Sequence, residues 1–210
     1  MSETSPRIAV LIPCYNEEAA IAQTVTDFRA ALPMATVYVY DNNSSDQTIA
    51  RAKEAGAVVR SEPRQGKGNV VRRMFADIEA DVYVLTDGDD TYDASVAPSL
   101  VQTLLDGAYD IISGRRIATA KDAYRAGHVL GNKLLTGLTA LMFNVHLKDM
   151  LTGYRIMSRR FVKSFPFTSA GFGIETELTV HAVRLLMPMV EIDTKYKERP
   201  EGSVSKLSTY

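Results

Sequence analysis

Cysteine is nearly absent from the chain, since Cys14 is the only one in 210 residues. A single cysteine excludes a disulfide framework and is typical of a reducing compartment. The three histidines have no zinc-ligand spacing, and one cysteine cannot complete a zinc site. No run of 18 apolar residues is present, so this chain is not expected to span a membrane. The short polar N-terminus predicts no signal peptide.

Several nucleotide and hydrolase motifs are also missing. No Gly-x-Gly-x-x-Gly follows the first apolar run, so a dinucleotide cofactor is not expected. The Gly-Lys-Gly of residues 66–68 does not complete a Walker loop, and no Gly-x-Ser-x-Gly elbow marks a serine hydrolase. Lys plus Arg is 24 and Asp plus Glu is 25. The resulting net charge of −1 gives no indication of a nucleic-acid partner, and none is predicted.

What the chain does contain is a regular alternation of strand and helix patterns. Its hydrophobic share of 46% and charged share of 23% are ordinary for a soluble globular protein of one large domain. Short apolar, β-branched runs predict strands at residues 7–12, 36–40, 57–60, 82–85, 109–113, 154–157 and 190–196. Helical patterns separate most of them, which predicts an α/β fold with a mainly parallel sheet covered by helices on both faces.

The strand at residues 82–85 runs directly into an acidic turn. Asp87 and Asp89 flank a glycine that allows a sharp turn, so their carboxylates could lie on one side of it. Such paired hard oxygen ligands suit Mg²⁺ or Mn²⁺. An isolated Asp-Gly-Asp is more often a solvated turn. An EF-hand fits poorly, because Thr91 and Pro98 stand at ligand positions.

Three predicted strands end in polar residues, at 15–17, 41–43 and 87–89. In a parallel sheet, ligands bind outside the carboxyl ends of the strands. Three polar ends at one edge therefore favour the metal site over the solvated turn.

Four further segments each allow two interpretations. Arg115 and Arg116 follow a strand and are either cations for a phosphate or a solvated basic loop. Residues 127–145 carry an apolar helical stripe, flanked by basic residues, that suits either a core or an anionic membrane surface. Glu175 and Glu177 lie at the beginning of a predicted helix, where their favourable interaction with the helix dipole accounts for them without a catalytic role. The polar residues 197–206 are either a disordered end or a loop that covers the substrate.

Five motifs, taken together and in order, resemble family 2 glycosyltransferases of the GT-A fold, a Rossmann-like sheet with helices on both faces. They are residues 12–18 (IPCYNEE), 41–48 (DNNSSDQT), 66–68 (GKG), 87–89 (DGD) and the tail containing Arg199 and Lys206. Within that family the chain most resembles polyprenyl-phosphate glycosyltransferases of the dolichyl-phosphate mannose synthase type. The resemblance implies one catalytic domain over residues 1–210, with a nucleotide-binding half at about 7–113 and an acceptor half at about 114–210.

The resemblance also implies roles for individual residues. The nucleobase and ribose would contact Pro13, Tyr15, Glu17 and Asp41, with Lys67 near the nucleotide. Asp87 and Asp89 would bind the Mg²⁺ or Mn²⁺ that bridges the diphosphate, and the donor or acceptor phosphates would face Arg115, Arg199 and Lys206. Two positions depart from the family pattern: Thr91 stands where glutamine is frequent, and Asn42-Asn43 replaces the usual Asp-Gly. The resemblance favours UDP over GDP, without naming the sugar.

The implied reaction is metal-dependent, inverting transfer of a sugar from a nucleoside diphosphate sugar to a polyprenyl phosphate at the cytoplasmic face of the membrane. A phosphate acceptor is already ionised and needs no base, whereas a hydroxyl acceptor would need one, from Glu175 or Glu177. Transfer to a hydroxyl and a non-catalytic nucleotide-sugar-binding or membrane-associated scaffold are the alternatives. Residues 205–210 carry no stop signal, which leaves open a membrane segment after Tyr210.

Overall fold

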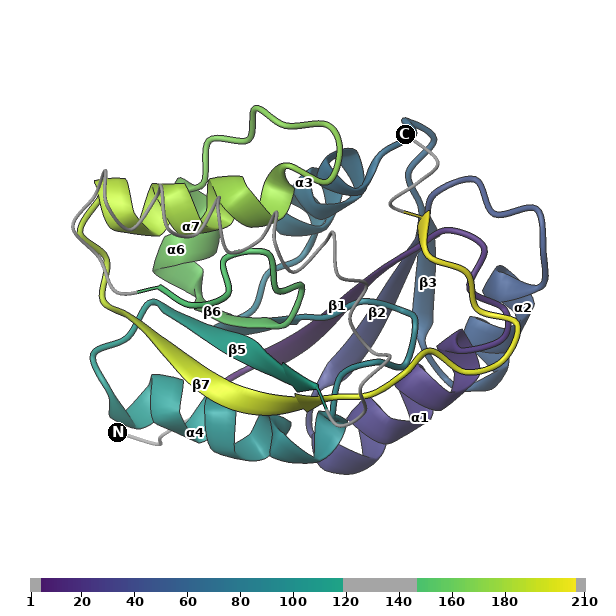
Figure 1. Cartoon of the computed structure of the whole chain (residues 1–210), viewed down its shortest axis with the longest axis horizontal. Coiled ribbons are helices and arrows are strands. Elements are labelled where there is room, and N and C mark those ends of the chain that lie inside the picture. The colour runs from purple at the N-terminus through teal and green to yellow at the C-terminus, as the bar shows by residue number, and fades with distance from the viewer. Residues whose placement is uncertain (1–4, 119–146, 207–210) are drawn as a thin grey trace.

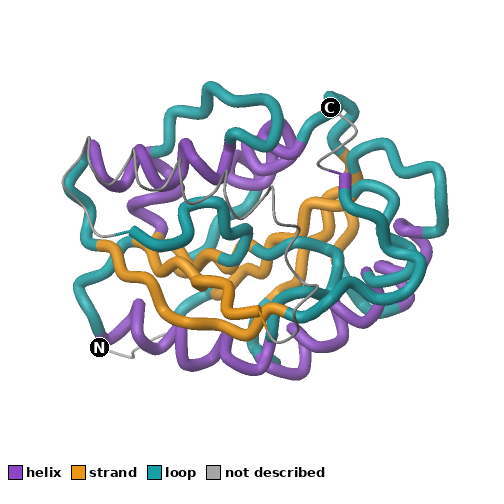
Figure 2. Tube along the Cα trace, viewed as in Figure 1, coloured by secondary structure: helices purple, strands orange, loops and turns teal. Residues whose placement is uncertain are grey.

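A seven-stranded sheet lies at the centre of the molecule, with helices above and below it (Figures 1 and 2). The computed structural model describes residues 5–118 and 147–206. The apolar stripe predicted at residues 127–145 lies outside the described residues, together with its flanking basic residues Lys121, Arg125, His128 and Lys133.

The strands are arranged in the order β3-β2-β1-β4-β6-β5-β7. Their bounds are β1 Ile8–Cys14, β2 Thr36–Asp41, β3 Val58–Ser61, β4 Val82–Leu85, β5 Ile111–Ala118, β6 Arg155–Ser158 and β7 Met189–Tyr196. Strands β1 to β4 pair in parallel, and β7 is parallel to β5. Only β6 runs antiparallel to its two neighbours within this sheet. The predicted mainly parallel α/β architecture is therefore confirmed.

The helices divide between the two faces of the sheet. Their bounds are α1 Ile21–Ala31, α2 Thr48–Glu54, α3 Lys67–Asp77, η1 Ala94–Val96, α4 Ala97–Asp106, α6 Arg159–Ser164 and α7 Ile174–Arg184. Figure 1 shows α1 and α4 on one face and α3, α6 and α7 on the other. Two hydrophobic cores result, one beneath each layer of helices.

Strand β1 explains why both faces are covered. Val10 and Ile12 enter one core, while Ala9 and Leu11 enter the other, because successive side chains of a strand point to opposite faces. All of them are at most 2% exposed. A strand buried on both faces reads as a continuous apolar run rather than an alternating one. The helices on the two faces are thus a consequence of the apolar strand sequences.

Two predicted strand ends were wrong. Strand β1 continues through Pro13 to Cys14, because β2 pairs with it up to that residue. Its pairing with β4 already stops after Leu11. Strand β5 continues from Ile111 to Ala118 along β7, so Arg115 and Arg116 lie in a strand and not in a basic loop. The short helix α6 was not predicted.

Across residues 5–118 and 147–206, none of the helices has the length and apolar character needed to cross a membrane.

Candidate active site

Four carboxylates gather where β1, β2 and β4 end. The buried thiol of Cys14, the last residue of β1, lies among them. Burial raises its pKa well above the usual value, and the charges of Glu17, Asp41, Asp87 and Asp89 raise it further. Asp41 is the last residue of β2, and the other two aspartates follow β4. The parallel register of these strands therefore brings together the acidic residues that the sequence places up to 72 positions apart.

Asp87 belongs to a buried chain of charges. Its Oδ1 accepts a hydrogen bond from Lys67 Nζ at 2.5 Å, and Lys67 also donates to Glu175 Oε1 at 2.5 Å. Burial alone would raise the pKa of Asp87, but the adjacent Lys67 ammonium, with Arg199 and Arg116 further off, lowers it. Lys67 is the first residue of α3, and Glu175 lies in the first turn of α7. One lysine thus links the two halves of the chain at the site.

Asp89 is paired with a different cation. Arg199 Nη2 lies 2.5 Å from its Oδ2, while its Oδ1 accepts a hydrogen bond of 2.6 Å from the Thr91 hydroxyl. The carboxyl is 2% exposed, and burial together with the charge of Asp87 raises its pKa above the usual value despite Arg199. The contact also gives Thr91 a role, because it orients the Asp89 carboxylate.

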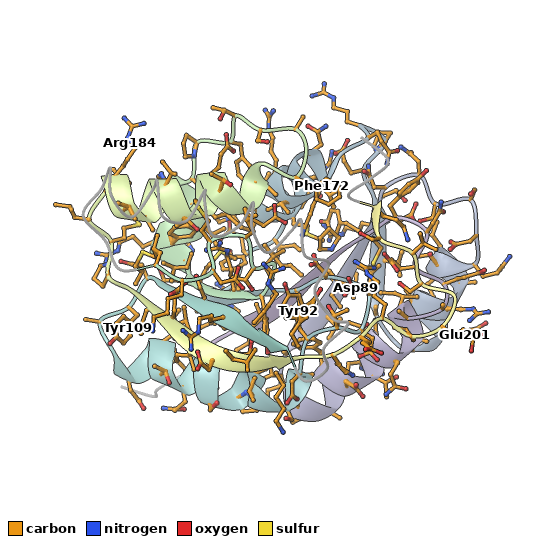
Figure 3. The ribbon with its side chains drawn as sticks, viewed as in Figure 1. Asp89, Tyr92, Tyr109, Phe172, Arg184 and Glu201 are labelled. Carbon is orange, nitrogen blue, oxygen red and sulfur yellow. The ribbon has the colours of Figure 1, made fainter. Side chains whose placement is uncertain are left out.

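The C-terminal tail, residues 197–206, closes over this cluster. Ser203 donates to Glu17 Oε2 at 2.9 Å, and Lys206 Nζ lies 3.2 Å from Glu17 Oε1. Arg199 reaches the same Oε1 at 3.5 Å. In Figure 3, Asp89 and Tyr92 lie within the molecule, whereas Glu201 of the tail lies at its outer edge. Residues 197–206 are therefore not a disordered end: they cover the acidic cluster and place Arg199 and Lys206 against acidic residues of the site, whereas a role in covering the substrate stays a prediction.

Asp41 and Asn42 behave differently although they are adjacent. The Asn42 side chain is fully engaged, since it donates to the carbonyls of Glu62 and Arg64 and accepts from the Gly66 N–H. Asp41 Oδ2 accepts from the backbone N–H of Ser44 at 3.2 Å. Its Oδ1 is buried and has no hydrogen-bond partner among the described residues. A buried acceptor without a partner is costly, so this oxygen is suited to a ligand N–H.

Pro13 and Tyr15 flank the end of β1. Pro13 is buried within β1. Tyr15 is half-buried and is the first residue after the strand, which ends at Cys14. Glu177, in contrast, does not belong to the cluster, because its carboxylate accepts hydrogen bonds from Thr168.

The two adjacent arginines of β5 have different surroundings. Arg115 makes a two-pronged ion pair with the exposed Asp193 at 2.5 Å. Arg116 makes one with the buried Asp149, at 2.8 and 2.7 Å, and its charge lowers the pKa of Asp87. The structure therefore places Arg116 in the field of the acidic cluster, whereas the family resemblance implied Arg115. Because successive side chains of a strand point to opposite faces, the sequence could have indicated that only one of these two arginines faces the site, but not which of them.

Arg155 is a functional candidate that the sequence did not reveal. It is fully buried and donates to the carbonyls of Thr152, Met150 and Glu175 and to the hydroxyls of Ser113 and Thr179. These acceptors are all neutral. Burial lowers its pKa, although the charge of Glu175 opposes this effect. Arg155 thus fixes the turn before β6 against the beginning of α7, where Glu175 meets Lys67.

The acidic pair can serve as part of a divalent cation site. Within the described ranges, no group of three or more His, Cys, Asp or Glu side chains is arranged to hold a metal. Asp87 and Asp89 provide two carboxylates, one partly exposed and one buried, whose charges act on each other. Mg²⁺ typically takes one or two carboxylates and completes its shell with water and substrate phosphates. The residues present therefore fit an ion that arrives together with a phosphorylated ligand.

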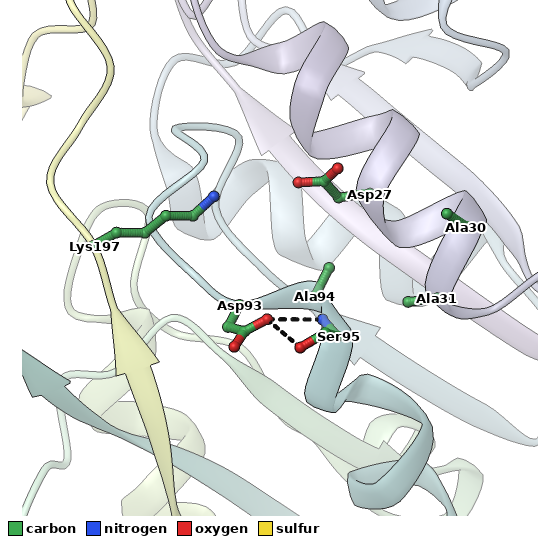
Figure 4. A pocket seen from close by; sticks show the side chains of 7 residues that line it. All are labelled: Asp27, Ala30, Ala31, Asp93, Ala94, Ser95 and Lys197. Carbon is green, nitrogen blue, oxygen red and sulfur yellow. Dashed lines mark hydrogen bonds between the residues drawn. The ribbon is translucent and has the colours of Figure 1, made fainter. Parts of the chain in front are cut away.

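A separate pocket of about 470 Å³ lies between α1 and η1. Figure 4 shows its lining, which consists of Asp27, Ala30, Ala31, Asp93, Ala94, Ser95 and Lys197. Asp93 caps η1 by accepting from Ser95, as a helix-capping aspartate does. None of the clustered carboxylates lines this pocket, so it is distinct from the acidic site.

Comparison with known proteins identifies the chain's relatives. The profile of glycosyl transferase family 2 matches residues 9–165. The chain belongs to this family. It is 34% identical to glycosyltransferase AglJ of Haloferax volcanii over 97% of the chain and 67% of AglJ. It is 28% identical to the dolichyl-phosphate hexose transferase of the same organism, over 91% of the chain and 83% of that protein.

Solved structures show the same fold. The glucosyl-3-phosphoglycerate synthase of Mycobacterium tuberculosis, in complex with Mn²⁺, UDP and glucosyl-3-phosphoglycerate, matches with a TM-score of 0.78 and 26% identity. The match covers 93% of this chain and 74% of that one. The same enzyme has also been solved with Mg²⁺ and UDP, at a TM-score of 0.77 and 25% identity. The predicted GT-A fold and glycosyltransferase class of the family 2 chain are therefore confirmed.

Proposed function

We propose that this family 2 glycosyltransferase transfers a sugar from a UDP-sugar to a polyprenyl phosphate, with Mg²⁺ or Mn²⁺ held by Asp87 and Asp89. The observation that carries the proposal is the placement of these two carboxylates around Cys14 together with Asp41, whose buried Oδ1 has no hydrogen-bond partner among the described residues. A cation site and a hydrogen-bond acceptor at the ends of β4 and β2, the strands on either side of β1, suit the diphosphate and the base of one nucleotide.

The preference for uracil follows from the hydrogen bonds of Asp41. Uracil offers one ring N–H, whereas guanine offers two adjacent N–H groups that would pair with both oxygens of a carboxylate. Oδ2 of Asp41 already accepts from the Ser44 N–H, and Oδ1 is the one oxygen of this carboxylate without a partner among the described residues. Pro13, Tyr15 and Glu17, at the end of β1, would complete the pocket for the base and ribose. The binding of UDP by the mycobacterial synthase supports this choice.

Breaking the sugar–phosphate bond develops negative charge on the departing diphosphate. A divalent ion bound by the two aspartates would supply Lewis-acid stabilisation of that charge. The chain adds cations, because Arg199 and Lys206 of the tail already lie at the acidic cluster. Arg116, oriented by Asp149, and Arg115, paired with Asp193, are further candidates, and each would have to share or leave its carboxylate to contact a phosphate. Forked guanidinium contacts to phosphate oxygens are among the stronger hydrogen bonds in proteins.

The state of Glu175 supports a phosphate acceptor over a hydroxyl acceptor. Its Oε1 lies 2.5 Å from the ammonium nitrogen of Lys67, and the Glu175 side chain is 8% exposed. Breaking such a buried pair is costly, so this carboxylate is committed to Lys67 and is not available as a base. A phosphate monoester is already ionised at pH 7 and attacks without a base. Its attack on the face of the sugar opposite the departing diphosphate would invert the anomeric centre. The relative named dolichyl-phosphate hexose transferase supports the same acceptor class.

A polyprenyl phosphate is confined to a bilayer, so we infer that the enzyme works as a peripheral protein on the cytoplasmic face of the membrane. Lipid flotation with anionic vesicles tests this inference, and full-length protein that remains with the unbound fraction would contradict it.

Sugar transfer is tested by incubating the purified protein with Mn²⁺, undecaprenyl phosphate in detergent micelles and a panel of radiolabelled UDP- and GDP-sugars. We expect one UDP-sugar to label the lipid fraction. Asp89→Asn should reduce the rate by at least about 10²-fold, because it removes a charged ligand of the ion. Asp106→Asn, the same change at an exposed helix end, is the matched control. Labelling of a soluble saccharide but not of lipid would favour the hydroxyl-transfer alternative, and an Asp89→Asn protein that retains cellular function would favour a scaffold.

A further inference from the structure

Arg199 occupies a position that the proposed metal ion needs. Its Nη2 lies 2.5 Å from Asp89 Oδ2, which is the oxygen left over after Thr91 has bonded to Oδ1. Its Nη1 reaches Glu17 at 3.5 Å. An ion that used Asp89 would meet a guanidinium at that oxygen and would be repelled by its charge. The contact is thus incompatible with simultaneous binding of the ion through Oδ2.

The tail holds Arg199 in place from both sides. On one side, the Lys197 N–H donates to the Thr91 carbonyl at 2.9 Å, and Lys197 Nζ pairs with Asp90 at 2.8 Å. On the other side, Lys206 Nζ donates to the Asn16 carbonyl at 2.8 Å. Since these contacts do not involve Arg199, its side chain can leave Asp89 while the tail stays anchored.

A nucleoside diphosphate offers Arg199 a better partner. The guanidinium fork matches phosphate oxygens, and two phosphate groups carry more negative charge than one carboxylate. Glu17, the second contact of Arg199, lies at the end of β1, in the predicted nucleotide pocket.

We propose that Arg199 fills the metal position on Asp89 in the nucleotide-free enzyme and moves to the diphosphate when the nucleotide binds. Free metal then competes with a built-in cation and binds weakly, whereas metal with nucleotide binds tightly. Metal and nucleotide affinities are therefore coupled through Arg199, and by linkage the coupling is reciprocal. This inference rests on the proposed use of Asp89 as a metal ligand.

The test measures Mn²⁺ binding directly, by the electron paramagnetic resonance signal of the free ion, at pH 8 with and without UDP. In the wild type, UDP is expected to tighten Mn²⁺ binding strongly. Arg199→Gln should bind Mn²⁺ alone about 10-fold more tightly than the wild type, within the usual range of coupling energies, and should show a smaller gain from UDP. Arg199→Lys, which keeps the charge but loses the fork, should fall between them and serves if the glutamine variant does not fold.

Lys195→Gln is the matched control, since it removes the same charge from an exposed position of β7 just before the tail and takes no part in anchoring the tail. Its Mn²⁺ affinity without UDP should remain that of the wild type. Equal or weaker Mn²⁺ binding by both Arg199 variants without UDP would overturn the proposal, as would the absence of Mn²⁺ binding in all proteins. The experiment needs neither lipid nor sugar. Lipid labelling by the wild type with no change in Mn²⁺ affinity would leave the proposed function standing and remove only this inference.

Discussion

Gly153 leaves no room for a side chain beside the carboxylate of Asp87. A Cβ at this position would lie 2.5 Å from Asp87 Oδ2 and 2.9 Å from its Cγ. The Gly153 N–H donates to the Tyr92 hydroxyl at 2.8 Å, which holds the turn in place. Asp87 is thus confined between the turn on one side and Lys67, bonded to its other oxygen, on the opposite side. A carboxylate with so little freedom is pre-organised for a ligand.

Gly153→Ala is expected to push the Asp87 carboxylate out of position. Because the clash is with a proposed metal ligand and not with the core, Mn²⁺ affinity in the presence of UDP should fall at least about 10-fold, a scale typical of disturbed ligand orientation. Isothermal titration with Mn²⁺ and UDP measures the effect. Gly171→Ala is the matched control, because no described atom lies within 4 Å of a Cβ there. Wild-type affinity in Gly153→Ala would show that Asp87 does not bind the ion.

Lys67→Met should destabilise the fold as well as the site. It would leave Asp87 and Glu175 without their shared cation at a position where the lysine side chain is 12% exposed. Removing one partner of a buried ion pair typically costs about 3–5 kcal/mol, and urea denaturation measures this free energy of unfolding. Adding Glu175→Gln should restore part of the loss, since it removes one of the two uncompensated charges.

The control for that series is Arg73→Met, which breaks an exposed ion pair with Asp77 on the same helix. Exposed pairs contribute about 0–1 kcal/mol, so a small loss is expected. A Lys67→Met protein as stable as Arg73→Met would mean that the buried chain of charges does not stabilise the fold.

Much of the fold could be predicted from the sequence because the strands are buried on both faces. The run at residues 82–85 is apolar at every position and became β4, and the polar residues that follow it, Asp87 and Asp89, lie where the predicted sheet edge placed them. Strand ends were less accurate. They depend on how far the neighbouring strand extends, as Pro13 shows, and local sequence does not contain that information.

The contacts between distant segments could not be predicted. Arg199 and Asp89 are far apart in the chain, and no local pattern indicates that they touch. In the sequence, Arg155 resembled an ordinary residue at the start of a short strand. In the structure it is buried, and its guanidinium donates hydrogen bonds both to the turn before β6 and to α7. Such roles arise from the order β4-β6-β5-β7, which places the second half of the chain beside the first.

Acid should weaken the fold through Asp110. Burial raises the pKa of this carboxyl, but hydrogen bonds from Arg160 and Ser158 and the charge of Arg160 outweigh it, so the pKa is lowered. A lowered pKa contributes stability that is fully present above the unfolded value of about 4 and is lost as pH falls through the folded value. The melting temperatures of wild type and Asp110→Asn should therefore differ most near neutral pH and converge at acidic pH. A constant difference between pH 7 and pH 3 would contradict this account.

Glu175→Gln separates the two acceptor classes. Glutamine keeps an oxygen for Lys67 but cannot accept a proton from an acceptor hydroxyl. With polyprenyl phosphate, kcat should change by less than about 10-fold, because no base is needed, while the weakened hold on Lys67 can raise KM for the donor. With a hydroxyl acceptor, loss of the base would reduce kcat by about 10²-fold or more. Glu177→Gln is the control, since the Glu177 carboxylate lies outside the acidic cluster and accepts hydrogen bonds from Thr168, and it should leave both values unchanged. A 10²-fold loss of kcat with the lipid acceptor would show that Glu175 acts as a base after all, and would transfer the proposal to hydroxyl chemistry.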